Sequence, residues 1–141
     1  MAGAVVGAAA ASLTGCAPGE PDPLKALAAR ARADAALINE MLADPATGAA
    51  LSDRLSPVAD ARGQHAKALA VELGETATPT PAPASGPPPP PDPKAALTRV
   101  RAALDVARQQ AAALVPTLPR RRAALVGSIA ACCAAYREVL G

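Results

Sequence analysis

The stretch DPLKALAARARADAALINEMLADP, residues 22–45, decides the fold. It begins and ends with Asp-Pro, a pair in which the aspartate caps a helix N-terminus and the proline takes the first helical position. Between the two pairs, apolar residues recur at helical spacing from Leu24 to Leu42. The stretch predicts one helix that ends near Ala43 and a second that begins at once. So short a connection favours an antiparallel helical hairpin.

The same signals recur along the rest of the chain. The second helix should run to about Leu73, with Gly74 as its C-cap and with Pro57 either kinking or restarting it. A third Asp-Pro pair at residues 92–93 starts a helix that ends before Pro116, and a fourth helix begins near Pro119. The inner face of the fourth helix is predicted to carry Leu125, Ile129, Cys132, Cys133, Tyr136, Val139 and Leu140.

A proline-rich segment, residues 75–93, separates the two pairs of helices and contains five consecutive prolines at 87–91. Such a sequence adopts extended polyproline II at about 3.1 Å per residue, so it can cross the length of a bundle. We therefore predict an all-α fold, a four-helix bundle built from two antiparallel hairpins at 22–74 and 94–141 and joined by this crossover linker.

Composition limits both the core and the partners. The chain has no Trp and no Phe, so Tyr136 is its only aromatic residue and alanine must fill much of the core. Net charge is −2 over residues 17–74 and +6 over residues 94–141. This asymmetry favours docking of the two halves on each other, with an anionic surface facing the second half as the alternative. Nucleic acid is not expected as a partner, because one tyrosine offers no stacking surface.

The start of the chain has the features of a targeting segment. Residues 2–12 are apolar and small, and the tetrad Leu13-Thr14-Gly15-Cys16 follows, ahead of a polar spacer that contains proline. This tetrad resembles the lipobox of bacterial lipoproteins. The resemblance implies a signal peptide at 1–15, a lipidated Cys16 with a spacer to residue 21, and attachment to the outer face of the plasma membrane. The segment Met1-Ala2-Gly3 has no Lys or Arg, which favours a true start upstream of Met1. If the tetrad is accidental, a cytosolic helical adaptor is the alternative.

Candidate site residues lie on the predicted first hairpin. His65 is the only histidine and borders the apolar stripe of the second helix, with Arg62 three residues before it. Dimetal bundles need Glu-x-x-His on two helices, and a cation in place of the Glu opposes metal binding. We expect a hydrogen-bonded polar cluster of Asp34, Glu40, Arg62 and His65, with no metal, no other cofactor and no catalytic residue. The alternative is a metal-binding or redox protein that uses His65 with Asp34, Glu40 or Glu72.

Two further motifs lie in the fourth helix. Arg120, Arg121 and Arg122 fall in its first turn, where we expect a solvated turn or pairing with acids of the first hairpin, with an anion-binding site as the alternative. Adjacent side chains on a helix point about 100° apart, so Cys132 and Cys133 cannot bridge each other there. We expect both to be small buried residues, with an intermolecular disulfide or a redox role as the alternative.

A wider resemblance rests on Asp22-Pro23-Leu24, Ala31-Arg32-Ala33-Asp34, Leu55-Ser56-Pro57-Val58-Ala59, Gln64-His65-Ala66, Ser128-Ile129-Ala130-Ala131-Cys132-Cys133 and Val139-Leu140-Gly141. With the lipobox, these segments make the chain similar to alanine-rich actinobacterial lipoproteins that carry a ferritin-like helical domain. The resemblance implies a ferritin-like four-helix bundle at the cell envelope with no settled activity. Our leading hypothesis is a non-enzymatic module there that binds a protein partner or an anionic envelope component. Because neither hairpin contains Glu-x-x-His, it implies no ferroxidase activity.

Overall fold

The computed structural model describes residues 19, 21–75 and 92–141, and this part of the chain is helical with no strands. The helices are α1 (Pro23–Ala43), α2 (Pro45–Glu72), α3 (Pro93–Leu114) and α4 (Arg120–Val139), with a short 3₁₀ turn, η1 (Val115–Thr117), between α3 and α4. The all-α prediction is confirmed for these residues. The leader, Cys16 and residues 76–91 of the predicted linker lie outside the described residues.

Three of the helices begin at the predicted Asp-Pro pairs. The Asp22 Oδ1 atom accepts a hydrogen bond from the backbone N–H of Leu24 at 3.0 Å. Asp44 accepts in the same way from Thr47 at 2.8 Å, and Asp92 from Ala95 at 2.8 Å. Each carboxylate thus satisfies one of the N–H groups that a helix start leaves unpaired, and the following proline removes another.

Helix α2 excludes one of the two effects predicted for Pro57 and agrees with the prediction at Gly74. The helix is continuous through Pro57, so the predicted restart is wrong. Pro57 and Asp53, the residue whose carbonyl loses its N–H partner, are both exposed, and water can satisfy that carbonyl. Gly74 has a φ of 69°, and Glu75 donates its N–H to the carbonyl of Ala70 at 2.9 Å. The left-handed conformation of Gly74 and the hydrogen bond from Glu75 back to Ala70 end α2.

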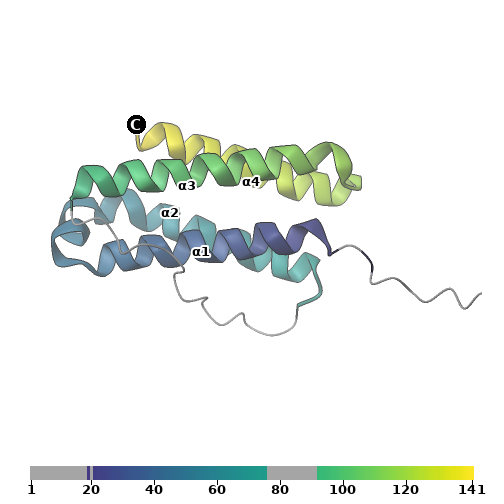
Figure 1. The fold of residues 1–141 in the computed structure, drawn as a ribbon, viewed down its shortest axis with the longest axis horizontal. Helices are drawn as coiled ribbons and strands as arrows, with labels where there is room; N and C mark the ends of the chain where they lie inside the picture. The colour runs from purple at the N-terminus through teal and green to yellow at the C-terminus, as the bar shows by residue number, and fades with distance from the viewer. Residues whose placement is uncertain (1–18, 20, 76–91) are drawn as a thin grey trace, which may run out of the picture.

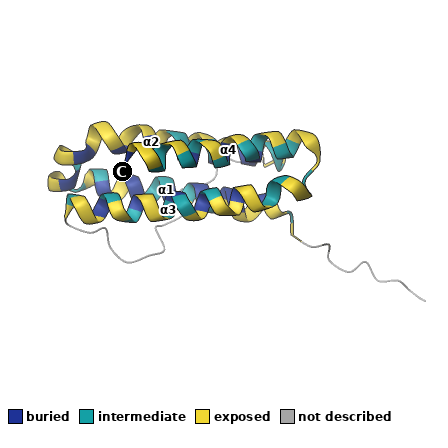
Figure 2. Cartoon of the chain, turned by 90° about the horizontal axis from the view of Figure 1, so that it is seen from above, coloured by how far each residue is buried: buried dark blue, intermediate teal, exposed yellow. Residues whose placement is uncertain are grey.

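The helices pack as an elongated helical bundle (Figure 1). The most extensive packing is α1 against α2, followed by α3 against α4, and α1 against α3 joins the two pairs. Helices α2 and α4 touch at few places. Figure 2 shows buried residues on the inward faces of the helices and exposed residues along their outer faces.

Alanine forms a large part of the core, as the composition predicts. The fully buried alanines Ala28, Ala31, Ala96, Ala107 and Ala111 lie among a small set of larger side chains, which includes Leu24, Leu55, Leu69, Leu104 and Ile129. Small residues let helix backbones approach closely, but each contributes little apolar area. A few leucine and isoleucine side chains therefore carry much of the packing energy.

The inner face of α4 corrects the prediction at two positions. The buried residues are Val126, Ile129 and Cys133, with Leu140 just beyond the helix end. Val139 is 72% exposed and Cys132 is only partly buried, although both were expected to face inward. Each lies one residue, or about 100° of helix rotation, from the stripe that packs against the other helices.

Alanine substitutions at two glycines of α2 are expected to change the free energy of unfolding in opposite directions. A Cβ atom on Gly48 would collide with the carbonyl oxygen of Leu42, where α1 turns into α2, whereas a Cβ on Gly63 would meet nothing within 4 Å. We expect Gly48→Ala to lower the free energy of unfolding by about 1 to 3 kcal/mol, because backbone must move. Gly63→Ala should raise it by about 0.5 to 1 kcal/mol through helix propensity. Urea unfolding followed by circular dichroism measures both, and an equal gain from the two substitutions would contradict the tight turn.

Candidate functional site

A charged pair lies in the middle of the packing between α1 and α2. Asp34 occupies the buried stripe of α1, and Arg62 occupies the buried stripe of α2. Their side chains are 5% and 1% exposed, respectively. Helical periodicity therefore brings the two side chains inward at positions where a core normally carries apolar residues.

The guanidinium of Arg62 bonds to residues of three helices. Its Nη2 and Nε atoms both donate to Oδ2 of Asp34, at 2.8 and 3.1 Å. Its Nη1 atom lies 3.1 Å from Nδ1 of His65, on the next turn of α2, and 3.4 Å from Sγ of Cys133 on α4. We call Asp34, Arg62, His65 and Cys133 the Arg62 cluster. It connects α1, α2 and α4 through one side chain.

The charge states in the cluster follow from burial and from Arg62. Burial raises the pKa of Asp34, while the adjacent guanidinium opposes the rise. Arginine stays protonated in proteins, so we treat the pair as ionised at neutral pH. Burial, reinforced by the charge of Arg62, lowers the pKa of His65 to about 4. The imidazole is therefore neutral at pH 7, and because Nδ1 accepts from Arg62, its hydrogen is on Nε2.

The two thiols are poor nucleophiles in this setting. Burial raises the pKa of both Cys132 and Cys133, and it outweighs the opposing charge of Arg62. Because the thiolate is the reactive form, both groups are held in the inactive thiol form at neutral pH. The geometry supplies no activated nucleophile at this point of the bundle.

The structure brings three of the four predicted cluster residues together. Asp34, Arg62 and His65 are in contact, whereas Glu40 is an exposed residue near the end of α1. Sequence reasoning missed the contact of Cys133, which it treated only as a small buried residue. The spacing of Ile129 and Cys133 along α4 correctly placed this sulfur in the interior, but it carries no information on which side chain of α2 lies against it.

A groove of about 430 Å³ adjoins the cluster between α2 and α4. Its lining residues are Pro57, Asp60, Ala61, Gln64, His65, Cys132 and Tyr136. The His65 ring thus contacts the Arg62 guanidinium and also forms part of the groove wall. No sequence pattern predicts this groove, because its walls come from two helices that lie in different halves of the chain.

The arginine triplet is divided between ion pairs and solvent. Arg122 bridges the Asp22 carboxylate at 2.7 Å and the Glu72 carboxylate at 3.2 Å. Arg121 lies 3.6 Å from Glu72 but its side chain is 87% exposed, and Arg120 is exposed as well. Arg122 therefore pairs with acids of α1 and α2, while Arg120 and Arg121 remain on the surface.

The hydrogen bond from Leu24, followed by the contact with Arg122, holds the pKa of Asp22 below its ordinary value. Asp22 therefore has two roles, because it caps α1 through Oδ1 and pairs with α4 through Oδ2. The start of α1 is thereby tied to the start of α4.

Within residues 19, 21–75 and 92–141, no three His, Cys, Asp or Glu side chains gather closely enough to hold a metal ion. None of the helices there is both long enough and apolar enough to span a membrane. Comparisons with protein-family models, with curated proteins and with solved structures gave no significant match.

Proposed function

We propose that this chain is a lipid-anchored, non-enzymatic binding module on the outer face of the plasma membrane. In this proposal Cys16 carries the lipid, and residues 22–74 and 94–141 form two antiparallel hairpins of a ferritin-like bundle with one long crossover. The closer packing of α1 with α2 and of α3 with α4 supports the hairpin arrangement.

The observation that carries the non-enzymatic part of the proposal is the position of the Arg62 guanidinium. In ferritin-like metal proteins, carboxylates and histidines project into the bundle centre and share metal ions. Here Arg62 contacts Asp34 and His65 itself, so a cation of the protein takes the place next to both candidate ligands. This favours a structural polar cluster over the alternative of a metal-binding or redox protein.

Two exposed arginines, Arg120 and Arg121, form a basic surface at one end of the bundle, and this surface is the evidence for an anionic partner. Arg120 and Arg121 are exposed close to the start of α1, to which Arg122 is bonded through Asp22. A chain from Cys16 to Pro23 spans at most about 25 Å. A lipid on Cys16 would hold these two arginines near a membrane surface, where anionic headgroups attract cations.

Metabolic labelling tests the anchor. Labelled palmitate should enter the wild-type protein in membranes and should be absent from Cys16→Ser. Recovery of the wild-type chain unlabelled, in the soluble fraction and at its unprocessed mass, would instead support the cytosolic adaptor.

Metal analysis of the purified protein separates the binding module from the metal-binding alternative. We expect no stoichiometric metal in the wild type. Iron, manganese or zinc bound in a fixed ratio, and lost in His65→Ala, would overturn the proposal.

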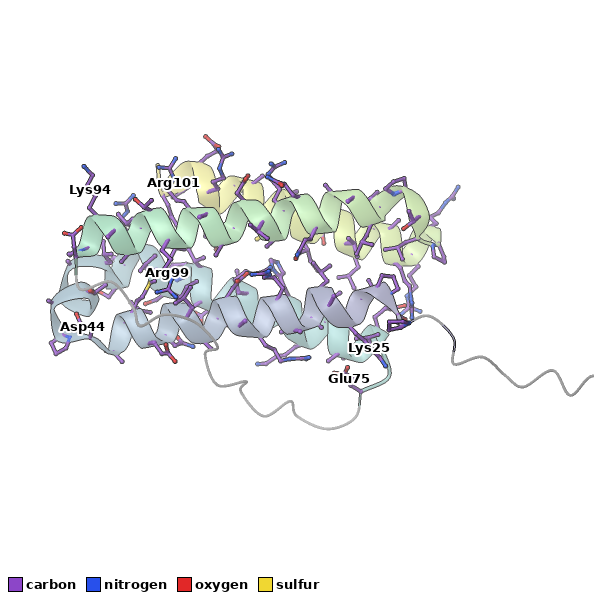
Figure 3. All side chains as sticks on the ribbon, in the orientation of Figure 1. Lys25, Asp44, Glu75, Lys94, Arg99 and Arg101 are labelled. Atoms are coloured by element: carbon purple, nitrogen blue, oxygen red, sulfur yellow. The ribbon has the colours of Figure 1, made fainter. Side chains whose placement is uncertain are left out.

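Vesicle binding tests the basic surface. With the mature chain produced without lipid, we expect Arg120→Ala/Arg121→Ala to weaken binding to phosphatidylglycerol vesicles roughly 10- to 30-fold, because each surface cation contributes about 1 kcal/mol. The matched control is Lys94→Ala/Arg101→Ala, which removes equal charge from exposed positions on α3. These positions are distant from Lys25, which lies in the first turn of α1 (Figure 3). Equal losses in both variants would show attraction by net charge alone.

A further inference from the structure

The His65 ring connects the Arg62 cluster to the groove. On one side its Nδ1 atom accepts a hydrogen bond from Arg62, and on the other side the ring lines the groove with Cys132 and Tyr136. His65 is the only histidine of the chain. Any change in its charge therefore acts on both features at once.

Protonation of His65 is incompatible with this arrangement. The Nδ1 atom lies 3.1 Å from Nη1 of Arg62 and can accept a hydrogen bond only while it carries no hydrogen. A proton on Nδ1 would point one N–H at another and would place two positive charges in contact. Asp34 cannot compensate easily, because its Oδ2 already accepts both hydrogen bonds from the other nitrogens of Arg62.

The other groups that face His65 do not relieve the repulsion. From α4, burial raises the pKa of the Cys132 and Cys133 thiols, so these groups carry no charge that could compensate, and Tyr136 contributes its ring to the groove wall. From α2, the Asp60 carboxylate lines the groove but is an exposed residue, so water screens it. From α1, Asp34 acts through Arg62. Arg62 is therefore the dominant charge near the ring.

The contact between α2 and α4 is the part of the bundle that can yield. These helices touch at few places, and the bond from Arg62 to Cys133 at 3.4 Å is one of the contacts between them. By contrast, α1 and α2 pack along their length and share the Asp34–Arg62 pair. If the guanidinium moves, the contact between α2 and α4 is lost before the packing of α1 against α2.

We propose that the Arg62 cluster is a pH-operated clasp, in which protonation of His65 breaks the bond from Arg62 to Cys133 and opens the groove between α2 and α4. The clasp does not depend on the lipid anchor or on the anionic partner proposed above. It gives the module a closed form at neutral pH and an open form in acid.

The direction and range of the effect follow from the pKa of His65. The folded value is about 4 and the ordinary value is 6.5, so the closed form binds the proton more weakly than an open or unfolded chain. The stability that neutral His65 provides is present above pH 6.5 and is lost as the pH falls toward 4. Asp34, whose pKa burial raises, has the opposite dependence, so a His65 variant is needed to isolate the histidine.

The chain contains its own two probes, since His65 and Tyr136 are its only histidine and its only tyrosine. In the full chain, NMR of the His65 Hε1 proton reports protonation, and near-ultraviolet circular dichroism of Tyr136 reports the groove. We expect both signals to change together with a midpoint between pH 6.5 and 4, while the far-ultraviolet helical signal is retained. In His65→Gln, which keeps an acceptor but cannot become charged, the Tyr136 signal should stay constant over that range.

Two results would overturn the clasp. One is a wild-type His65 that titrates without any change in the Tyr136 signal, which needs no variant to observe. The other is a His65→Gln protein whose Tyr136 signal changes at the same pH as in the wild type. If His65→Gln does not fold, the comparison of the two wild-type midpoints decides, because separate midpoints exclude the coupling.

Discussion

Replacing Arg62 by methionine is expected to lower the free energy of unfolding by about 3 to 5 kcal/mol. The substitution keeps most of the side-chain volume but leaves the Asp34 carboxylate, 5% exposed, without a countercharge. Removing one partner of a buried ion pair costs this much, because the remaining charge must be dehydrated without compensation. Small domains are stable by only about 5 to 15 kcal/mol, so part of this protein should be unfolded at 37 °C. Urea unfolding followed by circular dichroism measures the change.

The double variant Arg62→Met/Asp34→Leu separates loss of the ion pair from loss of packing. It removes both charges, so its stability should return to within about 1 to 2 kcal/mol of the wild type or exceed it. Arg108→Met is a matched surface control, since Arg108 pairs with Asp105 at 3.0 Å on the partly exposed face of α3, and its unfolding midpoint should not change. A small cost for Arg62→Met, with no recovery in the double variant, would mean that water reaches the pair.

Local signals predict the helices of this chain well, because each boundary depends on neighbouring residues. Three Asp-Pro pairs and Gly74 act within one helical turn, and the structure uses all four as predicted. Pro57 departs from its local tendency because tertiary packing on both sides of it, through Leu55 and Val58, keeps α2 continuous.

The candidate site was predictable only in part, because its geometry depends on how the helices rotate against one another. The sequence predicted a polar cluster of Arg62 and His65 with acids of the first helix, but its apolar periodicity did not distinguish Asp34 from Glu40, and only the structure shows that Asp34 is the buried partner. The exposure of Glu40 and of Val139 depends on a rotation that sequence spacing leaves uncertain by one residue. The contact of Cys133 and the groove beside Tyr136 require the relative position of α2 and α4, which are more than 45 residues apart in sequence and pack loosely.

Truncation of Leu104 to alanine is expected to cost about 2 to 5 kcal/mol, comparable to loss of the buried charge pair. Leu104 is 1% exposed on α3, and its neighbours one turn away on the buried stripe are Val100 and Ala107. A cavity beside alanine is filled poorly, since alanine side chains have no rotamers with which to occupy the space. The cost should therefore lie in the upper part of this range.

The controls for Leu104 distinguish volume from position. Leu104→Met conserves volume and should cost less than about 1.5 kcal/mol. Val106→Ala removes methyl groups from the same helix at a side chain that is 40% exposed, so it should change stability far less. A loss below about 1 kcal/mol in Leu104→Ala would mean that α3 is not packed against the rest of the bundle. Because the core contains so few large side chains, a single leucine on α3 and a single ion pair between α1 and α2 each control a large share of the stability.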